Sequence, residues 1–227
     1  MPSLVLFDLD NTLVDRATGL RRWAQEFCLQ RGLDGGAVEW IVDADGDGLV
    51  PKEIFFERLR QRFQLNEPAA QMWAAYRRRH PELIRPYPGA LDGLRRLRRQ
   101  GWAAGVVTNG SADQQTTTLT ATGLAGCLDA WAISEAEGVK KPERRLFEIA
   151  ADRCGTPLTH EGWMVGDSAT ADIAGAQDAG LKTIWIDRGH PWPLPDRKPD
   201  HTVGRIAEAI ELLLAWNAGP ENVQTDL

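Results

Sequence analysis

The sequence predicts an α/β protein with a doubly wound, Rossmann-like parallel sheet and an inserted small helical domain. Three observations predict this class. Short continuous apolar runs recur along most of the chain, each is followed by Gly, Asn, Asp, Ser or Thr, and an amphipathic helical pattern comes next. Strands that are apolar on both faces and alternate with helices are typical of a parallel sheet covered by helices on both sides.

The elements of this core alternate regularly from the first strand onward. The predicted strands are residues 4–7, 103–107, 130–133, 163–165 and 183–186. The predicted helices are residues 90–100, 112–121, 144–153, 170–179 and 205–216. Residues 190–199 are the most proline-rich part of the chain, so we expect a surface loop before the last helix.

One interval departs from this alternation, between the first and second predicted strands. From about residue 15 to residue 82 the chain shows no apolar strand, only helical patterns at 20–30, 52–63 and 67–80. This interval is too long for a single connecting helix. It predicts a helical domain at residues 15–82, inserted into a core that is formed by residues 1–14 and 83–227.

Composition and charge narrow the class of protein. The 227 residues are 43% hydrophobic and 26% charged, as in ordinary globular chains, and a net charge of −6 gives no general affinity for nucleic acid or membrane surfaces. The three cysteines show no CxxC spacing, which argues against a disulfide framework or structural zinc and for a reducing compartment. Without a signal-peptide pattern or a membrane span, we expect a cytoplasmic protein; its oligomeric state stays open.

Polar side chains suited to phosphate chemistry follow the predicted strands. In chain order they are Asp8, Asp10, Thr108, Asn109, Lys141, Asp167 and Asp172. The carboxyl ends of parallel strands border one crevice, so we expect these side chains to converge. Clustered carboxylates with few histidines favour Mg²⁺ as the bound metal. A lysine attracts an anion, and so do the amides of Asn109 and Gly110, which we expect at the start of a helix. Together they predict phosphoryl transfer with an aspartate nucleophile and a second carboxyl as acid and base.

Four motifs, in this order and spacing, make the chain resemble the haloacid dehalogenase superfamily. They are DLDNT at residues 8–12, TNG at 108–110, SEAEGVKKP at 134–142 and GDSATAD at 166–172. The similarity covers essentially the whole core, and it is to the phosphatase branch whose helical cap is inserted after the first motif. A lone DxD or GDS is a weak signal, but the four motifs together are specific.

The resemblance implies a magnesium-dependent phosphohydrolase that acts on a small phosphorylated metabolite through an aspartyl-phosphate intermediate. Asp8 would be the nucleophile and a metal ligand, Asp10 the acid and base and a metal ligand through its backbone carbonyl, and Asp167 a further metal-binding acid. Phosphoglycolate, sugar phosphates and nucleoside monophosphates are substrates of this kind. The sequence does not choose among them.

The same resemblance implies how the phosphoryl group is held. Thr108 and Asn109 would bind its oxygens, and Lys141 rather than Lys140 would be the phosphate-binding lysine. Asp172 would be a supporting acid near that lysine. Taken singly, each of these residues could instead cap a helix or a turn.

Other reactions on the same fold are alternatives. A 2-haloacid dehalogenase lacks the second acid and needs no metal, whereas this chain has Asp10. Phosphonate hydrolysis fits poorly for the same reason, because that branch also replaces the second acid. A sugar phosphomutase uses the same two acids and stays open. A non-catalytic phosphate-binding protein is disfavoured because every motif position is filled.

Two features of the predicted insert suggest further hypotheses. Residues 43–48 begin like a calcium-binding loop, but position twelve is Ile54 rather than a glutamate, which favours a polar turn. The insert also contains large side chains that could line a substrate pocket or select the leaving group. These candidates are Trp23, Trp40, Phe55 and Arg79.

Overall fold

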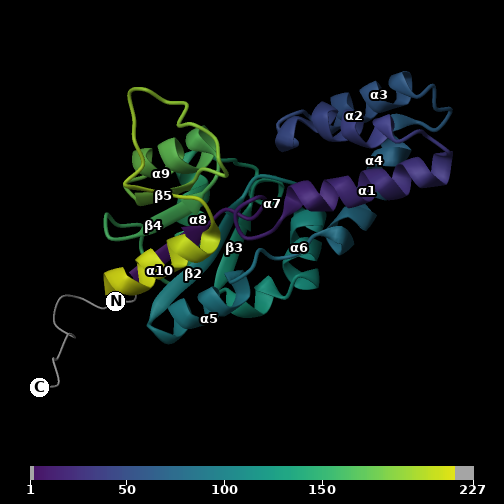
Figure 1. Ribbon diagram of the computed structural model, residues 1–227. Helices are drawn as coiled ribbons and strands as arrows, with labels where there is room; N and C mark the ends of the chain where they lie inside the picture. The colour runs from purple at the N-terminus through teal and green to yellow at the C-terminus, as the bar shows by residue number, and fades with distance from the viewer. Residues whose placement is uncertain (1–2, 218–227) are drawn as a thin grey trace, which may run out of the picture.

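The computed structural model describes residues 3–217, and its core is a sheet of six parallel strands. The strands are β1 (Ser3–Phe7), β2 (Trp102–Thr108), β3 (Ala130–Ile133), β4 (Trp163–Gly166), β5 (Lys182–Ile186) and β6 (His201–Val203). Their order across the sheet is β3-β2-β1-β4-β5-β6, and every neighbouring pair is parallel. The doubly wound fold class predicted from the sequence is therefore confirmed (Figure 1).

The five predicted strands are all present, and their ends differ from the prediction by no more than one residue. The sequence does not predict β6. This strand is three residues long, lies at the edge of the sheet beside β5, and exposes His201 and Thr202. A short edge strand of this kind has no continuous apolar run, so hydrophobic periodicity does not reveal it.

Helices cover both faces of the sheet. The core helices are α5 (Ala90–Arg99), α6 (Ala112–Ala121), α7 (Ser134–Glu137), α8 (Arg144–Arg153), α9 (Gly175–Asp178) and α10 (Ile206–Asn217). Successive side chains of a strand point to opposite faces. Val5 and Phe7 of β1 therefore pack in one buried cluster with α5 and α10, whereas Leu4 and Leu6 pack in another with α8 and α9.

The predicted helix at residues 170–179 is not one regular α-helix. Its first part, Ala169–Ala174, is a π-helical turn that α9 continues. Asp172 lies in this wider turn and is buried, with both carboxylate oxygens bonded inside the protein. Such turns are frequent at functional sites. Apolar periodicity predicts that a helix is present here, but it does not distinguish an α-helix from a π-helix.

Between β1 and α5 the chain forms a helical insert, defined here as residues 16–83. Its helices are α1 (Arg16–Arg31), α2 (Gly36–Asp45), α3 (Lys52–Arg62) and α4 (Ala69–Leu83), with a 3₁₀ turn at Gly46–Gly48. These helices share a buried core of their own, which includes Trp23, Phe55, Phe56 and Tyr76. They lie to one side of the sheet rather than on either of its faces (Figure 1).

The sequence does not predict α2. This helix buries only Ala37, Ile41 and Asp45, and both its N-cap, Gly35, and its first residue, Gly36, are glycines that offer no capping side chain, so it lacks the usual helix signals. Residues 43–48 are consequently not one turn, because α2 ends only at Asp45 and the 3₁₀ turn follows it. No helix within residues 3–217 is long and apolar enough to cross a membrane.

The two segments that join the insert to the core lie side by side. The Asp15 N–H donates to the Arg85 carbonyl at 2.9 Å, and the Tyr87 N–H donates to the Leu13 carbonyl at 2.9 Å. The insert therefore leaves and rejoins the core at one place, directly after the DLDNT motif. This placement brings the insert close to the carboxyl ends of the strands.

Candidate active site

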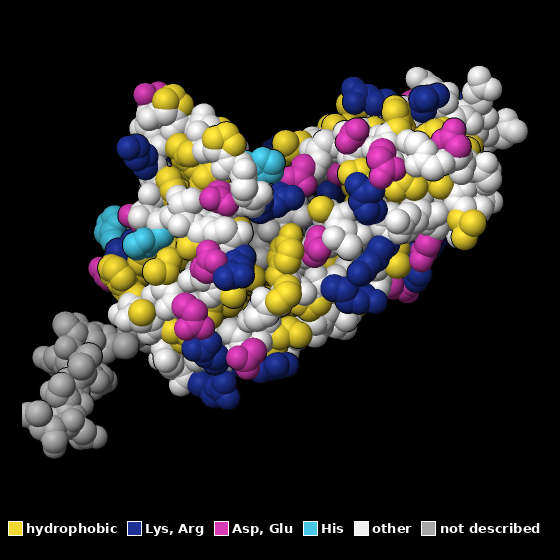
Figure 2. Space-filling model, in the orientation of Figure 1, with side chains coloured by type: hydrophobic (Ala, Val, Ile, Leu, Met, Phe, Trp, Pro, Cys, Tyr) yellow, Lys and Arg dark blue, Asp and Glu magenta, His cyan; other side chains and the backbone are white. Residues whose placement is uncertain are grey.

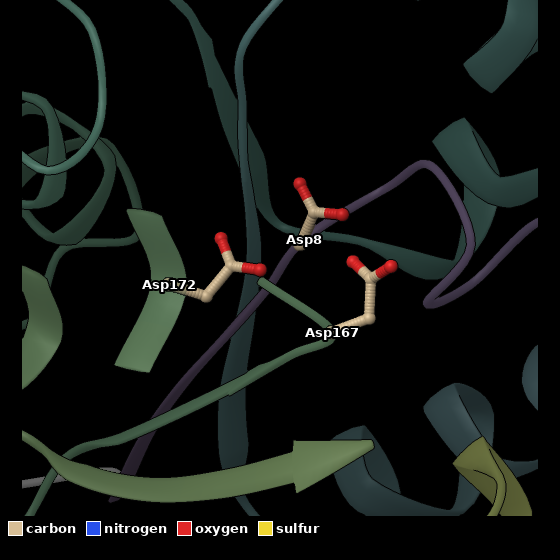
Figure 3. A group of neighbouring side chains, drawn as sticks. All are labelled: Asp8, Asp167 and Asp172. Carbon is tan, nitrogen blue, oxygen red and sulfur yellow. The ribbon is translucent and has the colours of Figure 1, made fainter. Parts of the chain in front are cut away.

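Three carboxylates meet at the carboxyl ends of β1 and β4 (Figure 3). They belong to Asp8, Asp167 and Asp172, and one oxygen from each lies within 4.8 Å of the other two. Asp8 directly follows β1, and its N–H still donates to the Val165 carbonyl of β4 at 2.9 Å. Asp167 directly follows β4. The structure thus brings together three acids that the sequence predicts to converge.

Lys141 lies between two of these acids. Its Nζ donates to Asp8 Oδ1 at 2.5 Å, to Asp172 Oδ1 at 2.7 Å and to the Val107 carbonyl at 2.7 Å. All three donors of the ammonium group are used, and the side chain is buried. Lys140 is exposed. The lysine in the carboxylate cluster is therefore the one that the sequence predicts.

Asn109 is held against the backbone of that lysine. Its Oδ1 accepts from the Lys141 N–H at 2.9 Å, and its Nδ2 donates to the Lys141 carbonyl at 3.1 Å. The expectation that the amides here open a helix is wrong, because β2 continues to Thr108 and α6 begins only at Ala112. The Gly110 N–H donates to Ser134 Oγ at 2.9 Å and so has a protein partner.

Burial and the neighbouring carboxylates raise the pKa values of two of these acids. Burial raises the pKa of Asp8 well above its usual range; Lys141 opposes the rise, and Asp172 and Asp167 add to it. Burial and Asp172 raise the pKa of Asp167 to about 7, against the effect of Arg188. The cluster therefore holds more negative charge than its partners neutralise. A hard divalent cation fits, because the gathered ligand atoms are all carboxylate oxygens.

Asp10 lies outside this carboxylate cluster and has a different partner. Its Oδ2 accepts from Gln115 Nε2 at 3.0 Å, and the same amide nitrogen donates to Thr108 Oγ1 at 2.8 Å. Gln115 lies in α6 and is buried. Sequence reasoning does not find it, because a glutamine in a polar helix turn gives no sign of the direction in which it points.

A second set of contacts connects the insert to the cluster. Arg188 Nη1 donates to Asp167 Oδ2 at 3.0 Å and to Asp47 Oδ2 at 2.6 Å, and Asn11 Nδ2 donates to Asp47 Oδ1 at 3.0 Å. Asn11, Asp47 and Arg188 have φ values of 61°, 54° and 51°, a region that non-glycine residues rarely adopt. Such strain is concentrated at functional sites in many proteins. The sequence predicts neither Asp47 nor Arg188 as a site residue.

These side chains line a cavity of about 580 Å³ between the core and the insert. Figure 2 shows the surface notched between the helical insert and the lobe that carries β5 and the loop after it. The core contributes Asp8, Asp10, Thr108, Asn109, Lys141, Asp167 and Asp172, and the loop after β5 contributes Asp187, Arg188, His190, Pro191 and Pro193. The insert contributes Arg16, Asp47, Gly48 and Leu49. All seven residues that the sequence predicts to converge at the strand ends therefore border this cavity.

The large insert side chains expected at a substrate pocket do not line it. Trp23 and Phe55 are buried in the insert's own core, and Trp40 packs against that core. Arg79 pairs with Glu26 on the surface. This expectation is wrong because the aromatic side chains are needed to fill the insert, whose cavity wall is made by Arg16 of α1 and by the α2–α3 connection.

Comparison with known proteins agrees with this geometry. A family model described as haloacid dehalogenase-like hydrolase matches residues 5–186. The pyrimidine 5'-nucleotidase YjjG of Escherichia coli is 32% identical over 220 residues, which cover 92% of this chain and 96% of that protein. A glyceraldehyde 3-phosphate phosphatase of Pyrococcus furiosus is 27% identical, with coverage of 98% of this chain and 97% of that protein.

Solved structures show the same fold. The HAD-hydrolase YfnB from Bacillus subtilis, described as bound to magnesium, superposes with a TM-score of 0.78 at 23% identity, covering 93% of this chain and 98% of that one. Solved 2-haloacid dehalogenases also match, with TM-scores of 0.63 and 0.70. Overall shape therefore does not separate phosphate chemistry from halide chemistry, and the residues of the site must do so.

Proposed function

The chain belongs to the haloacid dehalogenase-like hydrolase family, and we propose that it is a phosphohydrolase that cleaves a small phosphomonoester through an aspartyl phosphate on Asp8. One observation carries the proposal. Asp8 and Asp10 line the same cavity, but Asp8 lies in the lysine-bound carboxylate cluster, whereas Asp10 is held by a neutral amide. Two acids in such different surroundings suit two different tasks.

The first task is nucleophilic attack by Asp8. Lys141 binds Asp8 Oδ1, which leaves Oδ2 to attack the phosphorus. The new bond joins Asp8 to the phosphoryl group, while the bond from phosphorus to the leaving oxygen breaks. Lys141 also supplies positive charge beside the transferred group, and Asn109 keeps the lysine backbone in place.

The second task is proton transfer by Asp10. Its carboxyl gives a proton to the leaving oxygen, which departs as an alcohol. The resulting carboxylate then takes a proton from water, and that water attacks the aspartyl phosphate. Inorganic phosphate is released and Asp8 is restored. Halide needs no such proton, because it leaves as a stable anion, so a second acid favours phosphate ester chemistry.

Mg²⁺ is the cofactor that fits the donor set. Asp8 and Asp167 would hold it, with the backbone carbonyl of Asp10 as the further ligand that the family resemblance implies. Asp172 suits a supporting role, because its two oxygens already accept from Lys141 and from the Ser168 N–H. When bound, the ion would offset the repulsion between the carboxylates and the phosphate dianion and polarise the phosphoryl oxygens.

The helical insert, predicted as a separate domain at residues 15–82, would serve as a cap over this cavity. Arg16, Gly48 and Leu49 support that role because they face the site from the insert side. A cavity of about 580 Å³ suits a small metabolite. Nucleotides and triose phosphates are therefore reasonable first substrates to test, since relatives named for them align over nearly the whole chain.

The test compares two esters and two enzymes. Wild type and Asp10→Asn would be assayed in single turnover on an alkyl phosphate and on an aryl phosphate, with Mg²⁺ and with excess chelator. We expect Asp10→Asn to lower the alkyl rate by about 10²–10⁴-fold and the aryl rate by less, because an aryl leaving group needs less protonation. A chloride-release assay with 2-chloropropionate runs in parallel. Chloride release without metal, together with no phosphate release from any ester, would overturn the proposal.

A further inference from the structure

Gln115 contacts two groups of the site with one amide nitrogen. Its Nε2 donates to Asp10 Oδ2 at 3.0 Å and to Thr108 Oγ1 at 2.8 Å, so both N–H bonds are used. The side chain is buried and reaches Asp10 across 105 positions of the sequence. A Cβ at residue 110 would lie 3.0 Å from the Gln115 side chain, so the glycine there leaves room for it.

The contact with Asp10 distinguishes the two oxygens of that carboxyl group. The bond from Gln115 Nε2 occupies Oδ2 and fixes the plane of the carboxyl group. Within residues 3–217 no hydrogen bond reaches Oδ1, and Asp10 lines the cavity. Oδ1 is therefore the oxygen that faces a leaving group, without a rotation of the carboxyl group during turnover.

The contact with Thr108 fixes the direction of a hydroxyl hydrogen. Because Oγ1 accepts from Gln115, the single O–H hydrogen of Thr108 points elsewhere. Within residues 3–217 no protein acceptor binds that hydrogen, and Thr108 lines the cavity. The hydroxyl is thus oriented to donate to a phosphoryl oxygen.

We propose that Gln115 is a positioning residue that orients the Asp10 carboxyl group, with Oδ1 toward the leaving oxygen, and turns the Thr108 hydroxyl toward the phosphoryl group. This proposal rests on the proposed function. An amide suits the position better than a carboxylate would, because it supplies two donors and adds no negative charge to a site that already has a surplus. Methionine has a similar length but offers no donor.

The chain offers a matched control in the adjacent residue. Gln114 lies on the same helix, but its Nε2 contacts His80 Nδ1 at 3.2 Å instead of the site. The variants are Gln115→Met and Gln115→Glu, with Gln114→Met and Gln114→Glu beside them. Rates would be measured in single turnover on a series of phosphomonoesters whose leaving groups differ in basicity.

We expect Gln115→Met to slow alkyl phosphate cleavage by about 10- to 100-fold, and aryl phosphate cleavage by less. The plot of log rate against leaving-group pKa should become steeper. Binding of inorganic phosphate, measured by calorimetry, should weaken because the Thr108 hydroxyl is no longer oriented. Gln115→Glu should be slower still, and both Gln114 variants should keep the slope and the phosphate affinity of wild type.

Equal losses on every ester, or equal effects of the Gln114 variants, would mean that Gln115 only packs, and the proposal would fall. If Gln115→Met does not fold, wild type can be tested by NMR. The chemical shifts of the Gln115 side-chain amide protons should change in Asp10→Asn, because the oxygen that accepts one of its N–H bonds is altered; no change would overturn the proposal. A wild type that cleaves no phosphomonoester would instead overturn the proposed function itself.

Discussion

The core and the helical insert each bury one charged side chain between two groups of opposite sign, but with the signs reversed. In the core, Lys141 lies between Asp8 and Asp172, with Asp167 nearby. In the insert, Asp45 lies between Arg16 and Lys52. The core cluster therefore has a surplus of negative charge and the insert cluster a surplus of positive charge.

The carboxylate at the centre of the insert cluster is satisfied by the protein itself. Asp45 accepts from Arg16 Nη1 at 2.9 Å and Nη2 at 3.0 Å, from Lys52, and from the Gly48 N–H at 2.7 Å. Burial alone would raise the pKa of Asp45, but Arg16 and Lys52 outweigh it and lower the pKa to about 2. These bonds hold Gly48, and with it the cavity wall, against α1.

The core cluster is not satisfied in the same way. The pKa values of Asp8 and Asp167 are raised rather than lowered, and both residues border the cavity. The comparison teaches that burial of charge has two outcomes. A buried charge that is surrounded by opposite partners supports structure, whereas a group of carboxylates beside a cavity is prepared to bind a cation. The following variants break or sharpen this contrast, in order of expected effect.

The largest effect should come from Asp8→Asn. The amide has nearly the same shape but cannot attack phosphorus, so turnover should fall by on the order of 10⁵–10⁶-fold, as when other enzymes lose a nucleophile. Borohydride trapping of wild type during turnover should label Asp8. Circular dichroism and thermal unfolding serve as the control for folding. Near-normal turnover by Asp8→Asn, or a label on another residue, would contradict the assignment.

The next effect is on stability and differs between the clusters. Asp45→Asn should lower the free energy of unfolding by about 3–5 kcal/mol, because the buried Arg16 and the half-buried Lys52 lose the one carboxylate that pairs with them in residues 3–217. In metal-free protein, Asp167→Asn should cost less than about 1 kcal/mol, since removing one acid relieves repulsion within the core cluster. Urea unfolding in chelator measures both variants. Equal losses would show that the clusters do not differ in this way.

Mg²⁺ should stabilise the protein through the core cluster alone. At a Mg²⁺ concentration of 100 times Kd, the free energy of unfolding should rise by about 2.7 kcal/mol. Asp45→Asn should keep this increment, whereas Asp167→Asn should lose most of it. The increment is measured by urea unfolding with MgCl₂ against NaCl of equal ionic strength. An undiminished increment in Asp167→Asn would remove that residue from the metal site.

The last contrast is in the pH dependence of stability, whose sign should differ between the clusters. The pKa of Asp45 falls from 3.8 to about 2 on folding, so its stabilisation of about 2 kcal/mol is present above pH 4 and is lost as the pH falls toward 2. The pKa of Asp167 rises from 3.8 to about 7, so metal-free protein should lose stability as the pH rises from about 4 to about 7.

The pH dependence that each carboxyl group causes can be isolated by comparing wild type with the variant that lacks that carboxyl group. The difference in free energy of unfolding between wild type and Asp45→Asn should shrink between pH 5 and pH 3. The free energy of unfolding of wild type minus that of Asp167→Asn should instead fall as the pH rises from 4 to 8. Parallel curves for the two variants would contradict the reversed signs.

Much of the site was predictable from the sequence, because strand ends carry it. A buried parallel strand is readable as an apolar run, and hydrogen bonding between neighbouring strands brings their carboxyl ends to one edge. Asp8 and Asp167 are therefore within reach of each other once β1 and β4 pair. Lys141 follows β3 by only a short segment, so its place near this edge was also predictable.

Other features depended on packing that no local pattern records. Whether Gln114 or Gln115 faces Asp10 is decided by how α6 docks beside the segment that follows β1, and the two side chains are chemically identical. The pairing of Arg188 with Asp47 joins residues 141 positions apart, from a loop and a short turn.

The chain by itself thus determined the α/β core, the presence of a helical insert and the acids at the strand ends. It did so because apolar periodicity and the succession of strands and helices along the chain can be read from local stretches of sequence. Only the tertiary structure decided which insert residues meet the cavity, which amide orients Asp10, and that the two buried clusters have opposite charge. These outcomes depend on how separate elements dock, and docking is set by the shape and burial of whole surfaces rather than by any single segment.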